Sequence, residues 1–186
     1  LAREFADWKN TKEPKYSRLV DKVKTVDTGS SESVYIPDKT NAVYYATQNL
    51  PITDTHPDYA ALRLANYIIG GGFLNSRLAT RVRQKEGLSY TIQSSLSADS
   101  LDPVGAFTIY AIAAPENMKK VETAIQEEVE RAIKDGFTAE EVEAAKRGYL
   151  ESLKVARSQD NNLAYLLSTY MFIDRDVLWL SDWEKK

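Results

Sequence analysis

Cysteine is absent from this 186-residue chain, and histidine occurs once. Without cysteine the chain has no disulfide, no thiol nucleophile and no thiolate ligand for a metal. Zinc sites in proteins take most of their ligands from histidine and cysteine, and one imidazole is too few. The residue types present therefore exclude a zinc site built by this chain alone.

A large net charge and long apolar runs are absent as well. The formal charge is −3, which argues against nucleic acid or an anionic membrane as the main partner. No apolar run approaches the roughly 20 residues that a membrane-spanning helix needs. With 43% hydrophobic and 27% charged residues, a chain of this length can bury a substantial core. We expect one globular domain, with no nucleic-acid partner and no membrane span.

Two catalytic motifs are missing from the sequence. The Gly-x-Ser-x-Gly nucleophile elbow of serine hydrolases does not occur, and neither does the His-x-x-Glu-His motif of zinc peptidases. His56 stands just before a predicted helix start at Pro57. We therefore expect His56 to be a capping or surface imidazole rather than a ligand or a catalytic base.

Periodicity predicts a mixed set of elements. Alternating, β-branched or aromatic stretches predict strands at 33–37, 42–50, 88–98 and 105–114. Apolar residues at helical spacing predict helices at 57–70, 74–86, 115–135, 138–156 and 161–173. The last two strands flank Asp102-Pro103 and should form a hairpin, its second strand buried on both faces. This order predicts an α+β two-layer sandwich: a mostly antiparallel sheet with helices packed on one face.

The stretch from Gly70 to Tyr90, GGGFLNSRLATRVRQKEGLSY, combines several local signals. Three glycines open it and suggest a turn with positive φ. An apolar stripe then faces a set of cations made of Arg77, Arg81, Arg83 and Lys85. Gly87 ends the helix, and alternation begins at Leu88. The stretch predicts a glycine loop, a short basic helix, a tight turn and a strand.

This stretch resembles the signature of the C-terminal-type domain of the M16, or pitrilysin-like, zinc metallopeptidases. That signature runs glycine-rich loop, Ser-Arg-Leu, short helix, then Arg, six residues and Tyr. Ser76-Arg77-Leu78 and Arg83…Tyr90 match its order and spacing. The resemblance implies that Arg83 and Tyr90 are the catalytic candidates, which contact the substrate backbone opposite a zinc site in another domain. From the residues alone, a solvated helix cation and a sheet-face aromatic are the favoured interpretation.

The resemblance also implies how the chain is organised. Asp7-Trp8-Lys9 is similar to the end of the linker between the two M16 halves, although an ordinary frayed terminus is the alternative. We expect residues 1–32 to be a linker from an N-terminal domain. Residues 33–186 would be an M16-like C-terminal domain, truncated at its C-terminus.

The function implied is that of the substrate-binding, chamber-completing domain of a zinc-dependent endopeptidase. Zinc is expected in an N-terminal zinc-binding domain or subunit, a peptide is the expected substrate, and this chain alone should be inactive. Two alternatives stay open. One is a non-catalytic M16-like scaffold or chaperone-like subunit, and the other is an unrelated α+β peptide-binding module.

Overall fold

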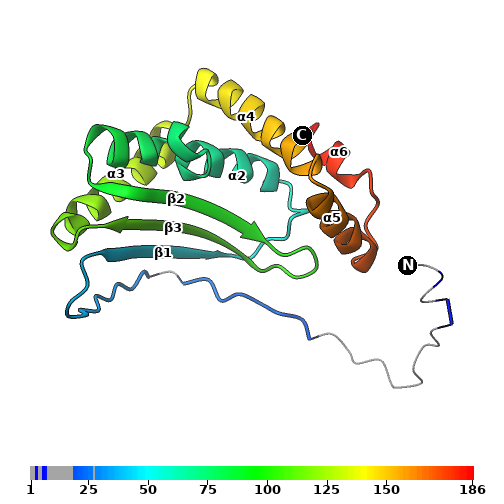
Figure 1. Cartoon of the computed structure of the whole chain (residues 1–186), viewed down its shortest axis with the longest axis horizontal. Coiled ribbons are helices and arrows are strands. Elements are labelled where there is room, and N and C mark those ends of the chain that lie inside the picture. Colours follow the sequence, from blue (N-terminus) through cyan, green and yellow to red (C-terminus); the bar gives the residue numbers. More distant parts are fainter. Residues whose placement is uncertain (1–2, 4–5, 8–18, 27) are drawn as a thin grey trace.

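The computed structural model describes residues 3, 6–7, 19–26 and 28–186. Asp7 is described, but Trp8, Lys9 and most of the predicted linker before residue 19 lie outside this part of the chain. Three strands form one antiparallel sheet in the order β1-β3-β2 (Figure 1). The strands are β1 (Ala42–Leu50), β2 (Ser89–Ala98) and β3 (Gly105–Ala113).

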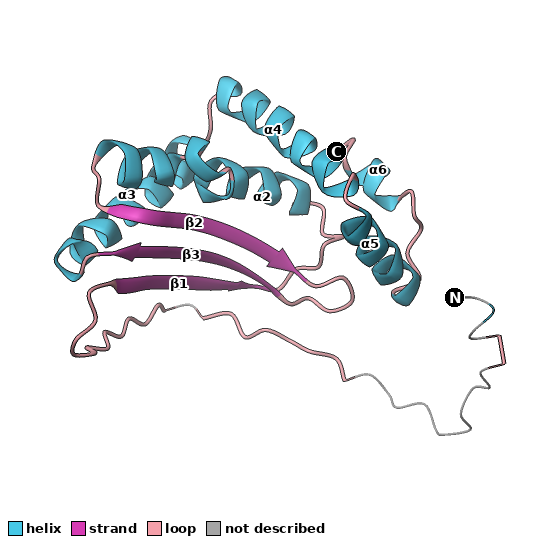
Figure 2. Ribbon diagram, viewed as in Figure 1, coloured by secondary structure: helices cyan, strands magenta, loops and turns pink. Residues whose placement is uncertain are grey.

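Helices account for most of the remaining described residues. The α-helices are α2 (Tyr59–Asn66), α3 (Met118–Asp135), α4 (Ala139–Arg157), α5 (Asp160–Phe172) and α6 (Trp179–Trp183). Shorter segments are π-helical at Tyr67–Gly71 and Ala79–Lys85, and 3-10 at Phe73–Asn75 and Pro115–Asn117. Figure 2 shows α2, α3 and α4 gathered on one side of the strands. The predicted α+β sandwich with helices on one face of an antiparallel sheet is confirmed.

The core lies between the sheet and these helices. Its buried residues come from the signature stretch, from β2 and β3, and from α3: Ile69, Leu78, Ala79, Val82, Ile92, Ile109, Ala111, Ala113, Val121, Ala124 and Ile125. Alternate residues of β3 point into this cluster because side chains alternate between the faces of a strand. The prediction that β3 is central is confirmed, and so is its hairpin with β2.

The prediction that β3 is buried on both faces is wrong. Ala106, Thr108, Tyr110 and Ile112, on the face away from the helices, are only half-buried. No helix of the described part covers this face. The apolar run of β3 therefore reflects its central position in the sheet rather than a layer on each side.

The predicted strand at 33–37 is also wrong. This segment is extended but has no strand assignment, and the side chains of Val34 and Tyr35 are 76% and 88% exposed. A strand needs a neighbour for its backbone hydrogen bonds, and none is paired with it among the described residues. The chain before β1 instead contacts the sheet edge at single points, as where Asn49 Nδ2 donates to the Lys24 carbonyl at 3.2 Å.

Helix α4 forms an outer layer over α2. It begins at a capping box: Glu141 N donates to Thr138 Oγ1 at 3.2 Å, and Thr138 N donates to Glu141 Oε2 at 2.8 Å. Gly148 lets α4 approach α2, since a Cβ there would lie 2.6 Å from the Tyr67 hydroxyl. Among the described helices, none is both long enough and apolar enough to cross a membrane.

Candidate substrate-contact site

The glycine loop brings the signature stretch close to the sheet. A Cβ on Gly70 would lie 2.5 Å from the backbone nitrogen of Ser94 in β2, so only glycine fits there. Gly71 and Gly72 are similarly crowded by Asn66 and Tyr67. The expectation of positive φ at these three glycines is wrong, because the positive value falls on Phe73, at +53°. Close approach to neighbouring backbone and side chains explains the three glycines.

The basic helix (residues 77–85) is anchored by its apolar stripe. Leu78 and Val82 are fully buried in the core cluster, one turn apart. Ser76 precedes the helix, is also fully buried, and donates from its hydroxyl to the Phe73 carbonyl at 2.8 Å. These contacts fix the rotation of the helix, and with it the direction of each arginine.

Arg77 is locked into the fold. Its Nε and Nη2 bind the two carboxylate oxygens of Glu141 at 2.6 and 2.8 Å, and Nη2 also donates to the Gly136 carbonyl at 3.0 Å. The guanidinium lies 4.8 Å from the centre of the Phe137 ring. The hydrogen bond from Arg77 lowers the pKa of Glu141 to about 2. These contacts give Arg77 a structural role, paired with the carboxylate of Glu141.

Arg81 is engaged in the same way. It binds Glu86 at 2.9 Å, Glu128 at 3.4 Å, and Glu127. The hydrogen bond with Glu127 is the main reason that the pKa of Arg81 is raised. A cavity of about 490 Å³ borders Arg77 and Arg81, and Glu86, Glu128 and Glu141 help to line it. All of its charged groups except Lys85 are paired with one another, so we regard it as part of the scaffold.

A tight turn joins the basic helix to β2. Gly87 has φ of +62°, which favours glycine, as the sequence predicted for a helix end. Glu86 N donates to the Arg81 carbonyl at 3.0 Å, and Leu88 N donates to the Val82 carbonyl at 2.9 Å. These two hydrogen bonds hold the start of β2 against the last turn of the helix.

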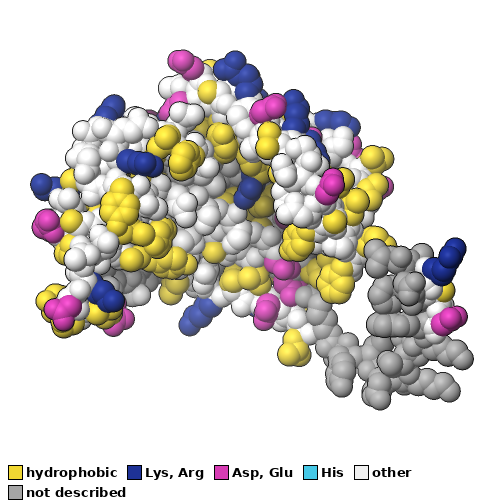
Figure 3. All heavy atoms as spheres, viewed as in Figure 1, with side chains coloured by type: hydrophobic (Ala, Val, Ile, Leu, Met, Phe, Trp, Pro, Cys, Tyr) yellow, Lys and Arg dark blue, Asp and Glu magenta, His cyan; other side chains and the backbone are white. Residues whose placement is uncertain are grey.

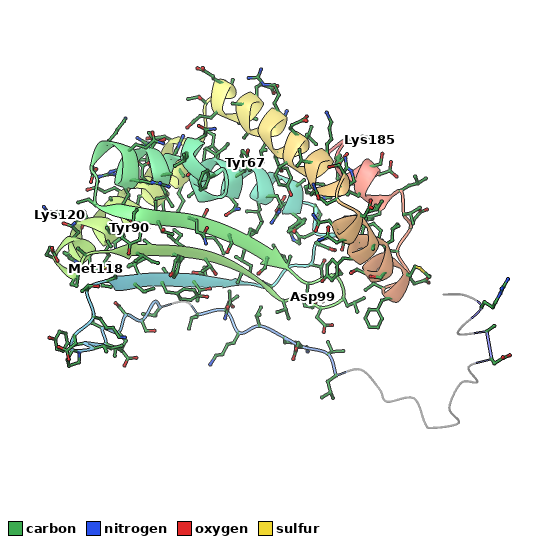
Figure 4. All side chains as sticks on the ribbon, viewed as in Figure 1. Tyr67, Tyr90, Asp99, Met118, Lys120 and Lys185 are labelled. Atoms are coloured by element: carbon green, nitrogen blue, oxygen red, sulfur yellow. The ribbon has the colours of Figure 1, made fainter. Side chains whose placement is uncertain are left out.

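A β-bulge places Tyr90. In the ladder with β3, Ser89 pairs with Ala113 and Thr91 pairs with Ile112, so Tyr90 is the additional residue. The buried Ser89 hydroxyl lies 2.6 Å from the carbonyl oxygens of both Thr91 and Ile112, so its one hydrogen has an acceptor on either strand of the irregular ladder. The Tyr90 side chain is consequently 54% exposed. Figure 4 shows Tyr90 at the start of β2, at the opposite end of that strand from Asp99.

Among the cations of the basic helix, Arg77 and Arg81 are paired with carboxylates, whereas the exposed Lys85 has no side-chain partner among the described residues. Arg83 and Tyr90 are likewise exposed, and neither side chain has a hydrogen bond or ion pair with any residue that the structure describes. They stand on either side of the Gly87 turn, at one end of the sheet. Donors without an internal acceptor can bind carbonyl or carboxylate oxygens from outside the chain.

His56 does not belong to this site. Its Nδ1 accepts a hydrogen bond from the Asp58 backbone nitrogen at 3.2 Å, in the turn before α2. In the described ranges, no cluster of three or more histidine or acidic residues could hold a metal ion. A single hydrogen bond at the helix entry explains His56.

The antiparallel sheet with helices on one face and the signature stretch are the two features to compare with known families. A family profile described as the peptidase M16 inactive domain matches residues 1–149. The chain belongs to this family. It is the C-terminal type of M16 domain, the half that lacks the zinc site.

Comparison with known proteins places the chain beside larger relatives. An uncharacterized zinc protease of Mycobacterium tuberculosis is 38% identical over 88 residues, which cover 46% of this chain and 19% of the relative. A non-peptidase homolog of Helicobacter pylori is 29% identical over 124 residues, which cover 66% and 28%. The crystal structure of a protease from Helicobacter pylori has a TM-score of 0.84 at 19% identity and covers 99% and 44%. The chain spans less than half the length of each.

Sequence reasoning missed the β-bulge. Residues 88–93 alternate regularly as LSYTIQ, which suggests a continuous strand with Tyr90 facing the same way as Ile92. In the structure Ile92 is buried and Tyr90 is exposed. The one available signal was Ser89, whose small hydroxyl can bond nearby backbone groups and so compete with regular pairing.

Proposed function

We propose that this chain is the substrate-binding, chamber-completing domain of an M16-type zinc endopeptidase. Arg83 and Tyr90 would contact the peptide substrate. The observation that carries the proposal is the contrast on one short helix: Arg77 and Arg81 are held by carboxylates, whereas Arg83 has no partner among the described residues. An exposed, unpaired guanidinium beside a bulged-out phenol is a poor stabiliser of the fold. It is well suited to bind a peptide.

The two side chains would contact different parts of the substrate. Tyr90 would donate its phenolic hydrogen to the oxygen of the scissile carbonyl, which gains negative charge as the bond is attacked. Arg83 would hold neighbouring backbone carbonyls or a carboxylate with its planar fork of donors. Zinc, in an N-terminal zinc-binding domain or partner subunit, would supply the activated water. The described part of this chain contributes no ligand cluster for that metal.

The domain boundaries follow from the same proposal. Residues 1–32 would link the zinc-binding half to this domain, and residues 33–186 would belong to the domain itself. The absence of regular secondary structure from residue 28 to 36 is compatible with a linker that leads into β1.

A second function has one specific observation in its favour. The Helicobacter pylori relative is named a non-peptidase homolog. The parent of this chain could therefore be a scaffold or chaperone-like subunit that binds peptides without cleaving them. A His-x-x-Glu-His motif in the partner half favours the peptidase, and its absence favours the scaffold.

The test is reconstitution. The zinc-binding half and this chain, purified separately, should each leave a fluorogenic peptide intact, and the mixture should cleave it. A folded Arg83→Ala/Tyr90→Phe double variant should bind the zinc half but fail to restore cleavage. An Arg147→Ala/Tyr45→Phe variant, altered at two exposed residues away from the site, serves as the control. Full cleavage with the double variant would disprove the assignment of the site.

A further inference from the structure

A second cavity lies at the other end of the sheet from Tyr90. It has a volume of about 200 Å³ and is enclosed by residues of α2, α4, α5 and α6, with Ser100 from the β2–β3 connection. Figure 4 marks Asp99, the residue before Ser100, at the far end of β2 from Tyr90. Five aromatic rings, two arginines and one carboxylate line the cavity. None of them belongs to the site proposed above.

One of the two arginines is neutralised. Arg175 binds Asp54 through two hydrogen bonds of 2.7 and 2.8 Å and lies 4.0 Å from the centre of the Trp179 ring system. The Ser100 hydroxyl donates to the same carboxylate at 2.7 Å. The charge of Asp54 is thus balanced by Arg175.

The other arginine, Arg63, has only neutral partners. Its Nε and Nη2 donate to the Tyr149 hydroxyl oxygen at 3.1 and 2.9 Å, and Nη1 donates to the Leu96 carbonyl at 2.8 Å. No carboxylate among the described residues forms an ion pair with it. A guanidinium has five N–H groups, so two remain unused. The cavity therefore carries one unbalanced positive charge.

The other polar groups of the wall are mainly donors. The Tyr149 oxygen accepts both bonds from Arg63, so its own hydrogen is available. Burial is the main reason that the pKa values of Tyr59 and Tyr170 are raised, and both phenols therefore keep their protons at neutral pH. The indole nitrogen of Trp183 is buried and has no acceptor among the described residues. The wall thus offers several donors beside its one carboxylate, and that carboxylate is already paired with Arg175.

We propose that this cavity binds a free carboxylate attached to a small apolar or aromatic group. The carboxylate would accept the two unused N–H groups of Arg63 and the Tyr149 hydroxyl, and the apolar group would pack against Trp179 and Trp183. The volume suits a group the size of one amino acid rather than the usual ligand pocket of about 300–1,000 Å³. The C-terminal residue of a peptide and a small carboxylic acid share this chemistry.

Tryptophan fluorescence offers a direct test. The chain has three tryptophans, and in a Trp8→Phe background the two that remain both line the cavity. N-acetyl-phenylalanine should change the emission in a saturable way, with a Kd near or below about 1 mM. Its carboxamide, which has the same ring but no charge, should bind at least about tenfold more weakly, since a charge-assisted contact is lost.

Two variants locate the carboxylate. Arg63→Gln should weaken binding by about tenfold or more, because it removes the unbalanced charge. Tyr149→Phe keeps the ring but removes the hydroxyl, and it should weaken binding severalfold. If Arg63→Gln does not fold, Tyr149→Phe still tests the proposal. Arg147→Gln, an exposed arginine on α4, is the control for net charge and should bind normally. Equal binding of acid and carboxamide, or unchanged affinity in Arg63→Gln and Tyr149→Phe, would overturn the proposal.

The source of the carboxylate is distinguished with Ala-Ala-Phe and its C-terminal amide. If the free tripeptide binds as well as N-acetyl-phenylalanine, the site takes peptide C-termini. If only the smaller acid binds, the site takes small carboxylic acids, and the carboxylate is still confirmed. If neither acid binds, the cavity is not a carboxylate site. None of these outcomes depends on Arg83, Tyr90 or zinc.

Discussion

The two ends of the signature stretch are used differently. The part from Gly70 to Val82 contains the glycine crowded against β2, the buried Leu78 and Val82, and the two arginines bound in ion pairs. From Arg83 to Tyr90 the stretch carries exposed side chains on a helix end, a glycine turn and a bulge. We call the first part, Gly70–Val82, the rigid base of the stretch, and the second part, Arg83–Tyr90, its projecting edge. Stability should depend on the first part and peptide binding on the second.

The largest expected effect tests the projecting edge. In the reconstituted enzyme, Tyr90→Phe removes one donor to the developing oxyanion, which should lower kcat by about 10²–10³-fold. The ring is retained and 54% exposed, so the melting temperature should hardly change. Steady-state kinetics beside Tyr45→Phe, another exposed tyrosine of the sheet, would measure this. Equal kcat in the two variants would remove Tyr90 from the mechanism.

The next effect tests the rigid base. Arg77→Ala leaves the carboxylate of Glu141 and the Gly136 carbonyl without their charged donor. Because this pair is mostly buried, the free energy of unfolding should fall by about 2–3 kcal/mol. Urea unfolding would show it, and the melting temperature should drop by about 5–10 °C. A loss no larger than that of Arg83→Ala would contradict the division of the motif.

Acid should weaken the rigid base in a defined range. Glu141 has a pKa of about 2 in the folded chain against an ordinary 4.5, so its stabilisation is complete above 4.5. As pH falls from 4.5 toward 2, the folded state loses this contribution because the unfolded chain takes up the proton first. The difference in unfolding free energy between wild type and Arg77→Ala should shrink over that range. A difference independent of pH would rule out this pair as the cause.

The smallest expected effect is that of a substitution in the projecting edge on the stability of the fold. Arg83→Ala should change the unfolding free energy by no more than about 0.5 kcal/mol, since the side chain is exposed and unpaired among the described residues. In the reconstituted enzyme it should raise KM, because a substrate-positioning contact is lost. Parallel melts and kinetics would separate the two readouts. A large loss of stability would show that Arg83 belongs to the fold.

The sequence predicted short-range features better than contacts between distant segments. The helix end at Gly87, the capping box at Thr138 and the hairpin of β2 and β3 each follow from local patterns, and the structure has all three. The cations of the basic helix looked equivalent in sequence. What separates them is the partner each meets, such as Glu141, which lies 64 residues from Arg77. Contacts over such distances depend on how α4 packs, which no local pattern encodes.

The bare face of β3 and the unpaired segment 33–37 were mispredicted for a related reason. An apolar run indicates burial, but it does not show how many layers or strands provide it. The aromatic cavity beside Arg63 was not anticipated either. Its residues come from α2, α4, α5 and α6, and each is an ordinary aromatic or cation in its own segment. The unbalanced charge of Arg63 becomes apparent only when the fold brings these residues together.

The bulge at Tyr90 has a consequence for how this strand can change. Because side chains alternate along a strand, one additional residue reverses the phase of everything that follows. Ile92, Ser94 and Leu96 point inward only because Tyr90 is accommodated outside the ladder. Deleting a single residue between Gly87 and Thr91 would have one of two results. Either the bulge that exposes Tyr90 is lost, or the side chains of β2 that now face the core face the opposite side of the sheet. Length at this turn should therefore be more constrained than the identity of its exposed side chains.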